Sequence, residues 1–434
     1  MSESPLADVE RAVLERAKAM ALDMAGDDGP VRLRALIEDE VARWSIDHKR
    51  GIHTFDLSDP ATVIGRAYRN LTGYGPLEPL LEDDDVWEIM INAPGAIFVK
   101  RHRGESGYHD EIFHDDEHVI RILTKILDDA STSHRKLDPS EGLQDAQLDT
   151  GARLHIIHGD VAKGGHVMVN IRKFTGVVFH TLDELAACDM FSAPVGSFLK
   201  ACVRSKLSVV FAGAPGSGKT TMLSCCAAEL DPRLRVVTAE EVFEADIPLP
   251  NVASMQTRAG RPDRPAVDLR RLVAAFLRMA PDVAIVGEVR DREALPLLLT
   301  LSSGVQGFTT IHAGSARQAL TRLRFICQLS DNDLPISALN SLVSEAVDVV
   351  VHCARTPSGP RVTEILAVED LANGEDATNF TVTELFHCEG LNGPLAWTGN
   401  IPVRIEGPLR DADHDLRSML DTDDAGCRPQ ERLA

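Results

Sequence analysis

The stretch FAGAPGSGKTT at positions 211–221 limits what this chain can fold into more than any other feature of its sequence. The apolar residues before it, Leu207, Val209 and Val210, are typical of a buried strand, and the residues after it, TMLSCCAAEL, suit a helix. Three glycines and a proline lie between the two, and glycine is the main residue type that lets a backbone wrap closely around another group. The stretch therefore predicts a strand, a glycine loop and a helix in direct succession.

Positions 213–220 fit the pattern G-x-x-x-x-G-K-[ST], whose loop binds phosphate. The loop N–H groups would point inward, and the N-terminus of the following helix would add partial positive charge. We expect Lys219 to reach the β- and γ-phosphates of a nucleotide and Thr220 to hold Mg²⁺. The other candidate contacts in the stretch are Gly213, Gly216, Ser217, Gly218 and Thr221. The alternative, a glycine turn that matches by chance, is disfavoured by the strand and the helix around it.

Composition argues against several classes of protein. The formal net charge of -21 disfavours a general nucleic-acid-binding surface and leaves no polybasic membrane anchor. No apolar stretch reaches the roughly 18–20 residues that span a bilayer, and the polar, acidic N-terminus is unlike a secretory signal. The eight cysteines include no C-x-x-C pair, so we expect no structural zinc and a reduced, cytoplasmic chain.

The pattern of apolar residues divides the chain into regions. Positions 1–70 carry apolar residues at helical spacing, such as Leu33, Ile37 and Val41, and predict a small helical region. Positions 71–176 mix strand-like runs with a helical run at 117–129 and predict a mixed α/β domain. From about position 190, strand-like and helix-like runs alternate, which points to a mainly parallel sheet and an α/β fold. We assign positions 177–190 to a linker with a helix start at TLDEL, 191–400 to the core and 401–434 to a loose acidic tail.

A second segment, PDVAIVGEVRD at positions 281–291, places a carboxylate just past a buried strand. In open α/β sheets ligands bind at the carboxyl ends of the strands, so Glu288 lies where a nucleotide would be. A phosphate loop alone supplies binding, whereas hydrolysis also needs a group that orients or deprotonates water. We expect Glu288 to be that group. The alternative is an ordinary surface glutamate in a glycine turn.

Two more segments contain groups that suit a nucleotide site. VVTAEEVFEADIPLPN is a strand followed by Glu240, Glu241 and Glu244. GFTTIHAGSARQALTRL is a β-rich run followed by His312 and a helix opened by Ser315. Taken singly, the acidic cluster is typical of a solvated loop and the histidine of a structural position.

Together, the four segments follow the order and spacing of a known family. The chain resembles the secretion and pilus-assembly ATPases of the type II/type IV secretion superfamily, over positions 70–390. In this resemblance GAPGSGKT is the Walker A box, VTAEEVFEA the aspartate box, AIVGEVRD the Walker B box and GFTTIHAGS the histidine box. Matches at GYGPLEPLL, VWEIMINAP, DAQLDTGARLH and NIRKF make the N-terminal half look most like the Tad/Flp pilus assembly (CpaF-type) ATPases. The conjugative type IV secretion ATPases are the next most similar.

The resemblance implies a RecA-like P-loop ATPase core, preceded by a mixed α/β N-terminal domain and a small helical N-terminal region, with ATP and Mg²⁺ as ligands. It makes Glu288 the catalytic glutamate and places Glu240 and Glu244 beside Mg²⁺ or water, with Glu240 as a candidate metal contact. It also implies that His312 couples the γ-phosphate state to neighbouring elements. Arg258 and Arg278 match arginines that surround the site, and one or both would act across a subunit boundary.

Two further arginines have expected roles. The resemblance implies that Arg172, in NIRKF, reaches the nucleotide from the N-terminal domain. Its segment, HVMVNIRKF, reads as an edge or near-edge strand in which alternation puts Val169 and Ile171 on one face and Arg172 on the other. Arg290, which follows the catalytic glutamate, fits a structural role as well as a catalytic one.

The sequence departs from the family pattern at several positions. Glu241 stands where the family usually has aspartate, and its longer side chain would shift the geometry at the metal. Ala280 and Gln147 each replace an arginine, which weakens charge stabilisation in the transition state or contacts between subunits. These changes leave the predicted fold as it is and bear on the level of activity.

The predicted function is ATP hydrolysis that drives a Tad/Flp-like pilus assembly machine at the inner face of the cell membrane. The resemblance implies a homohexamer and an inner-membrane platform protein as partner, and we expect no direct contact with nucleic acid. The alternatives are an ATPase of type IV secretion or conjugation and a nucleotide-gated scaffold with weak turnover. A RecA-type DNA motor is disfavoured by the acidic charge and by the histidine box.

Overall fold

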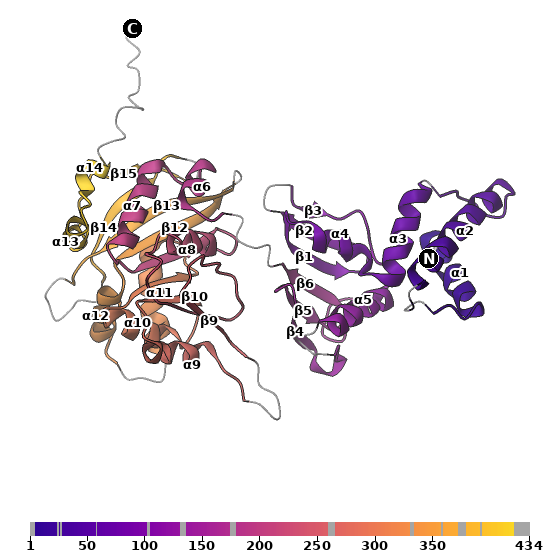
Figure 1. Cartoon of the computed structure of the whole chain (residues 1–434), viewed down its shortest axis with the longest axis horizontal. Helices are drawn as coiled ribbons and strands as arrows, with labels where there is room; N and C mark the ends of the chain where they lie inside the picture. Colours follow the sequence, from indigo (N-terminus) through magenta and orange to yellow (C-terminus); the bar gives the residue numbers. More distant parts are fainter. Residues whose placement is uncertain are drawn as a thin grey trace, which may run out of the picture. The chain divides into compact units, whose positions relative to one another are not determined.

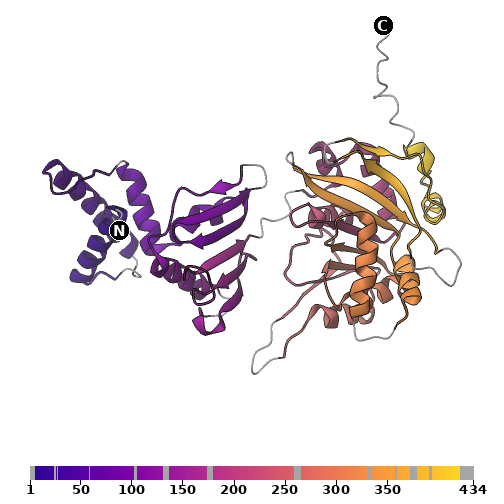
Figure 2. The same cartoon turned by 180° about the vertical axis from the view of Figure 1, so that it is seen from behind.

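The structure is a computed structural model, and it describes residues 5–23, 26, 28–57, 59–101, 105–130, 136–173, 179–258, 265–329, 334–356, 359–371, 379–390 and 393–420. The chain divides into two compact units, Met1–Thr175 and Gly176–Ala434. Figures 1 and 2 show the elements of each unit from two sides. Within these described ranges, no helix is both long enough and apolar enough to cross a membrane.

Unit 1 begins with three helices, α1 (Pro5–Ala19), α2 (Gly29–Lys49) and α3 (Pro60–Thr72). Their apolar faces pack together around Val9, Val13, Leu33, Ile37 and Val41. Asp59 starts α3, because its carboxylate accepts hydrogen bonds from two backbone N–H groups of the first turn and Pro60 follows at the first helical position. The predicted helical N-terminal region is therefore confirmed.

The rest of unit 1 is a six-stranded sheet in the order β3-β2-β1-β6-β5-β4, with neighbouring strands antiparallel. The strands are β1 (Val86–Ala93), β2 (Ala96–Arg101), β3 (Gly107–Tyr108), β4 (Leu143–Gln147), β5 (Arg153–Ile157) and β6 (Met168–Arg172). Helix α5 (Asp116–Asp129) packs Val119, Ile122 and Ile126 into the core of this sheet. Short helical turns lie at Gly75–Leu77, Glu78–Glu82 (α4) and Pro139–Glu141.

The strand that ends in Arg172 lies inside this sheet. β6 pairs with β1 on one side and β5 on the other, so the expected edge or near-edge position is wrong. The pairing is non-local, because β1 precedes β6 by more than 70 residues, and no local pattern reveals it. The expected alternation holds, since Val169 and Ile171 are buried and Arg172 is exposed.

Unit 2 is built on a nine-stranded sheet in the order β15-β14-β13-β12-β7-β11-β10-β8-β9. The pairs from β12 to β9 are parallel, and the pairs from β12 to β15 are antiparallel. The strands are β7 (Val209–Gly213), β8 (Val236–Glu240), β9 (Val252–Gln256), β10 (Val283–Val289), β11 (Gln306–Ile311), β12 (Val349–Thr356), β13 (Gly359–Val368), β14 (Val382–Cys388) and β15 (Leu395–Trp397). The mainly parallel core sheet predicted from the sequence is confirmed.

Helices cover both faces of the sheet in unit 2 (Figures 1 and 2). One core contains α6 (Leu182–Ala187), α7 (Ala193–Arg204) and α8 (Lys219–Ala227). The opposite core contains α9 (Leu269–Ala274), α10 (Ala294–Ser302), α11 (Ala316–Leu329) and α12 (Ile336–Ala346), and a short turn lies at Phe276–Met279. Burial on both faces explains why the central strands read as unbroken apolar runs.

The expected linker at 177–190 belongs largely to unit 2. Thr181 and Glu184 form a reciprocal cap at the start of α6, as the TLDEL segment predicts. Leu182, Leu185 and Met190 are buried in the core beside α7 and α8. The assignment as a linker is therefore wrong for residues 181–190, because their apolar side chains have a core to enter.

The expected loose tail is ordered over its first half. Helices α13 (Glu406–Asp411) and α14 (Leu416–Leu420) follow the last strand, and Ile405, Leu409 and Leu416 are buried in the same core as α7. The prediction is thus wrong for residues 401–420. Their composition is polar and acidic on average, but these three buried apolar side chains fix the segment to the core. The remainder of the predicted tail, 421–434, lies outside the described residues.

Arg404 attaches this C-terminal segment to the core. Its guanidinium donates to the backbone carbonyls of Ser344, Glu345 and Val347 at the end of α12, and it lies 2.9 Å from Asp348 Oδ1. Cations at a helix C-terminus are stabilising because the last carbonyls lack partners within the helix. Asp348 also accepts from the backbone N–H of Ser208, so the segment is tied to the start of β7.

We expect Leu409→Ala to destabilise unit 2 by about 2–5 kcal/mol, the usual cost of deleting a fully buried leucine side chain. Leu409 is 0% exposed, whereas Val403, six residues earlier, is 82% exposed. Val403→Ala is therefore the matched control, with an expected cost near zero. Urea unfolding of the full chain, followed by circular dichroism, measures both. Equal midpoints for the two variants would show that the segment does not contribute to the core.

Candidate active site

The loop between β7 and α8 has the conformation that its glycines predict. Gly216 and Gly218 have φ of 71° and 87°, in the region that favours glycine. A Cβ on Gly213 would lie 2.1 Å from the carbonyl oxygen of Cys353, so the backbone of β12 leaves no room for a side chain. The strand, glycine loop and helix expected from the sequence are all present.

The N-terminus of α8 is open toward the loop. Gly218 occupies the cap position and supplies no side-chain oxygen, so the first N–H groups of the helix remain available to an anion. Lys219 follows it and is only 6% exposed; its ammonium donates to the Ala214 carbonyl at 2.8 Å. Ser217 Oγ is buried without a hydrogen-bond partner among the described residues, and Thr220 and Thr221 are half-buried.

Glu288 lies on a bulge at the carboxyl end of β10. Val286 pairs with Thr309 and Val289 with Ile311, so β10 contains one more residue than β11 between these two pairs. Such a bulge turns a side chain out of the regular alternation of the strand. The Gly287 carbonyl accepts from Thr310 Oγ at 2.8 Å, which fixes the bulge from the neighbouring strand.

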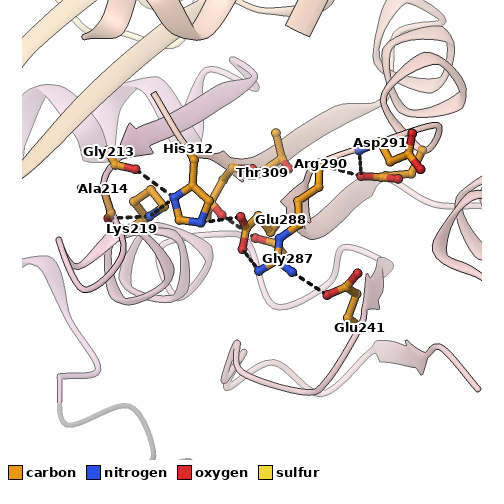
Figure 3. A network of polar contacts seen from close by, with 12 residues as sticks. Gly213, Ala214, Lys219, Glu241, Gly287, Glu288, Arg290, Asp291, Thr309 and His312 are labelled. Carbon is orange, nitrogen blue, oxygen red and sulfur yellow. Dashed lines mark hydrogen bonds and ion pairs between the residues drawn. The ribbon is translucent and has the colours of Figure 1, made fainter. Parts of the chain in front are cut away.

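His312 connects the phosphate loop to Glu288 (Figure 3). It follows β11, the strand between β7 and β10. Its Nδ1 lies 3.2 Å from the Gly213 carbonyl oxygen and 3.3 Å from Lys219 Nζ, and its Nε2 lies 2.8 Å from Glu288 Oε1. Burial and then the Lys219 charge lower the pKa of His312 below 6.5, against the opposing effect of Glu288, so the ring is neutral at pH 7.

Arg290 completes the network; the sequence left its role open between structural and catalytic. Its two terminal nitrogens lie 2.7 Å from Glu288 Oε2 and 2.8 Å from Glu241 Oε2 (Figure 3). Burial raises the pKa of Glu288, but the hydrogen bond and charge of Arg290 outweigh it, so the pKa lies below 4.5 and the group is ionised at pH 7. The signal in the sequence was the pair of opposite charges at the ends of β8 and β10, which are neighbouring parallel strands.

The two glutamates of the aspartate box are placed differently. Glu240 is only 3% exposed, and its Oε2 accepts from the backbone N–H groups of Glu244 and Ala245 at 2.9 and 3.0 Å. One of its two oxygens therefore holds its own loop in place. Glu244 is half-buried in that loop. A role for either residue beside Mg²⁺ stays a prediction.

Among the described residues, no hydrogen bond or ion pair joins Arg258 or Arg278 to this network, and Arg172 belongs to the other unit. Arg278 is exposed in the turn Phe276–Met279. Arg258 bridges to Val267 through its backbone and donates to the Pro265 carbonyl. Arg172 is exposed on β6 of unit 1. Of the departures from the family pattern, Ala280 has a left-handed φ of 49°, and the side chain of Gln147 lies outside the described residues.

The residues present fit a nucleotide that arrives with its metal. The open helix N-terminus and Lys219 provide positive potential for phosphates, and the Thr220 hydroxyl is a ligand type that Mg²⁺ accepts. Within the described part of the chain, no group of three or more His, Cys, Asp or Glu side chains forms a metal site of its own. Mg²⁺ characteristically uses one or two protein oxygens together with substrate phosphates, so such a group is not required.

Several curated bacterial proteins are similar in sequence to this chain. The chain is 31% identical to a protein of Mycobacterium tuberculosis strain H37Rv that is named for conjugal transfer, over 70% of this chain and 86% of that protein. It is 32% identical to the PtlH homologue of the Bordetella bronchiseptica type IV secretion system, over 64% of this chain and 88% of that one. It is 26% identical to the type IV secretion system protein VirB11 of Bartonella quintana, over 68% of this chain and 92% of that protein.

Two solved structures are similar to this chain. The VirB11 ATPase of Brucella suis, crystallised with sulphate, aligns at 25% identity with a TM-score of 0.36, over 70% of this chain and 97% of that one. The ATPase DotB of Legionella pneumophila aligns at 18% identity with a TM-score of 0.47, over 67% of this chain and 79% of that one. Scores below 0.5 add nothing to the fold described above.

The family model of the type II/IV secretion system proteins matches residues 70–376, well over half of the chain. The match contains the phosphate loop, Glu288 and His312, as well as the sheet of unit 1. The chain therefore belongs to the type II/IV secretion system protein family, and its core is a P-loop ATPase domain.

Proposed function

We propose that this protein hydrolyses ATP with Mg²⁺ to power a secretion or pilus machine at the inner face of the cell membrane. The observation that carries the proposal is the contact of His312 with both Lys219 and Glu288, at 3.3 and 2.8 Å. This cluster joins a phosphate-binding lysine to an ionised carboxylate at the carboxyl ends of neighbouring parallel strands, where α/β folds bind nucleotides.

The proposed chemistry needs no covalent intermediate. Lys219 exchanges the Ala214 carbonyl for phosphate oxygens, and the α8 N-terminus and Thr220 complete the binding of the phosphates and Mg²⁺. Glu288 accepts a hydrogen bond from the attacking water and orients it, while Arg290 keeps the carboxylate ionised. Glu240 holds the loop that presents Glu241 and Glu244 to the same edge of the sheet.

The first candidate machine is Tad/Flp-like pilus assembly, supported by the motifs of the N-terminal half. The second is type IV secretion or conjugation, which is favoured by the names of the relatives at 31% and 32% identity. Deleting the gene and complementing it with Glu288→Gln distinguishes them. Loss of sheared surface pilin would support the first, and loss of DNA or effector transfer with pilin unchanged would support the second.

We further propose a homohexamer that acts on an inner-membrane platform protein and does not bind nucleic acid. In this proposal Arg258 and Arg278, which lie outside the network in one subunit, contact the nucleotide of a neighbour. A third candidate function, a nucleotide-gated scaffold with weak turnover, is favoured by Ala280 and Gln147. We also propose the domain limits 1–70, 71–175 and 176–420, revised for the linker and tail corrections.

Glu288→Gln is expected to bind ATP with near-normal affinity and to hydrolyse it at least roughly a hundredfold more slowly, the scale of losing a water-orienting base. Lys219→Ala is expected to lose ATP binding itself, because the phosphates lose their point charge. Phosphate release and binding of a fluorescent ATP analogue measure the two effects. Wild-type turnover in Glu288→Gln would exclude this residue as the catalytic glutamate, and no turnover in the wild type would favour the scaffold.

A shared site predicts that specific activity rises with protein concentration, because isolated subunits lack the neighbour's arginines. Mixing inactive Lys219→Ala subunits with inactive Arg278→Ala subunits should restore part of the activity, since some interfaces then pair an intact lysine with an intact arginine. Sedimentation with Mg·ATP should show the ring. Activity per subunit that stays constant on dilution to monomers would refute the shared site.

Arg172→Ala is expected to fold and bind ADP but to lose ATP-driven compaction and most of its hydrolysis. A guanidinium can donate two hydrogen bonds to one phosphate. If Arg172 makes this contact only with the γ-phosphate, ATP favours the closed state by the free energy of the contact, and ADP does not. Small-angle scattering with ADP and with a non-hydrolysable ATP analogue measures compaction. Asn170→Ala, at another exposed position of β6, is the matched control. Compaction of Arg172→Ala like that of the wild type would mean that the side chain is a solvated charge.

A further inference from the structure

The loop that carries His312 is held by two side chains from other strands. It joins the end of β11, at Ile311, to the start of α11, at Ala316. Glu364 on β13 accepts a hydrogen bond from the backbone N–H of Ala316 at 2.8 Å. Burial lowers the pKa of His352 on β12, whereas Glu364 and the backbone of Ala313 raise it, so the ring lies beside this loop. The loop is therefore attached to the sheet at Ala316, four residues after His312, and it passes His352 at Ala313.

The two holding residues act as one unit of the sheet. His352 and Glu364 are direct partners in the antiparallel pair of β12 and β13. His352 Nδ1 lies 2.8 Å from Thr363 Oγ, which fixes the plane of the ring from the same neighbouring strand. On its other side β12 pairs with β7, where His352 stands opposite Ala212, next to the start of the phosphate loop. The pair therefore connects the loop that carries His312 with β7, the strand that precedes the phosphate loop.

Starting α11 does not by itself require Glu364. Ser315 already caps this helix, because its hydroxyl accepts from the backbone N–H of Gln318. Glu364 adds a second attachment, made by a residue 48 positions away in the chain. This second attachment restricts the position of His312. The three polar contacts of His312, at 2.8–3.3 Å, tolerate displacements of only a few tenths of an ångström.

We propose that His352 and Glu364 are positioning residues that set His312 between Lys219 and Glu288. The pair touches the backbone of the loop and acts on the reaction only through His312. This inference rests on the proposed ATP hydrolysis for its kinetic consequence, while the attachment of the loop can be measured without turnover.

The kinetic test compares two substitutions of one residue. Glu364→Leu keeps the size of the side chain and removes the acceptor, and we expect kcat to fall at least about tenfold with KM within about twofold, as for a misplaced group that does not bind substrate. Glu364→Gln retains an acceptor oxygen and should recover kcat to within about threefold of the wild type. His352→Leu should behave like Glu364→Leu. Glu384→Leu, on the adjacent strand β14 with its carboxylate paired to His387, is the matched control and should keep full activity.

A double substitution separates positioning from general stability. In a His312→Ala background, Glu364→Leu should cause no further loss of kcat, because the residue through which it acts is gone. An equal loss in both backgrounds would overturn the proposal, as would a Glu364→Leu variant with wild-type kcat, or equal losses in the Leu and Gln variants.

Hydrogen exchange keeps the inference testable if the wild type shows no turnover. The amide of Ala316 should exchange at least about tenfold faster in Glu364→Leu than in the wild type or Glu364→Gln, because only the leucine variant lacks its acceptor. Absent turnover in the wild type would refute the proposed function alone. Unchanged exchange at Ala316 in Glu364→Leu would refute the attachment of the loop by Glu364, whatever the turnover.

Discussion

The parallel pairing of β7, β11 and β10 is the constraint on which the site depends. Lys219, Glu288 and His312 belong to separate segments of the chain, yet each lies at or after the carboxyl end of one of these three adjacent strands.

 Lys219 lies 69 positions before Glu288, and Glu288 lies 24 positions before His312. Register, and not proximity in sequence, brings them together, since parallel strands end at a common edge. A slip of one residue would turn these side chains to the other face of the sheet.

Electrostatics then decides what the cluster can do. The ammonium of Lys219 and the carboxylate of Glu288 lie on either side of the neutral imidazole of His312. Lys219 lowers the pKa of this ring, and Glu288 raises it. Arg290 keeps Glu288 ionised despite its burial. An ionised carboxylate accepts a hydrogen bond from water better than a protonated one, so in the proposed hydrolysis Arg290 would act without having to touch substrate.

The sequence predicts those parts of the structure that local chemistry determines. The glycine loop, the cap at Thr181 and the alternation along β6 all follow from neighbouring residues. The interior position of β6, the bridge from Arg290 to Glu241 and the docking of Leu409 do not, because each joins segments far apart in the chain. Composition was misleading for residues 401–420, where a few buried apolar side chains outweigh a polar average.

The resting contacts of Lys219 also imply how the cluster responds to a phosphate. Its ammonium now donates to the Ala214 carbonyl and lies beside His312 Nδ1. A phosphate that takes this ammonium replaces a carbonyl partner with an anion, so the positive charge that lowers the pKa of His312 is neutralised. Burial, the larger cause of the lowered pKa, would remain, while the opposing effect of Glu288 would meet less competition from Lys219. In the proposed function, binding at the loop would thus act on the carboxylate through one side chain, and the loop that carries this side chain is attached to the sheet by Glu364.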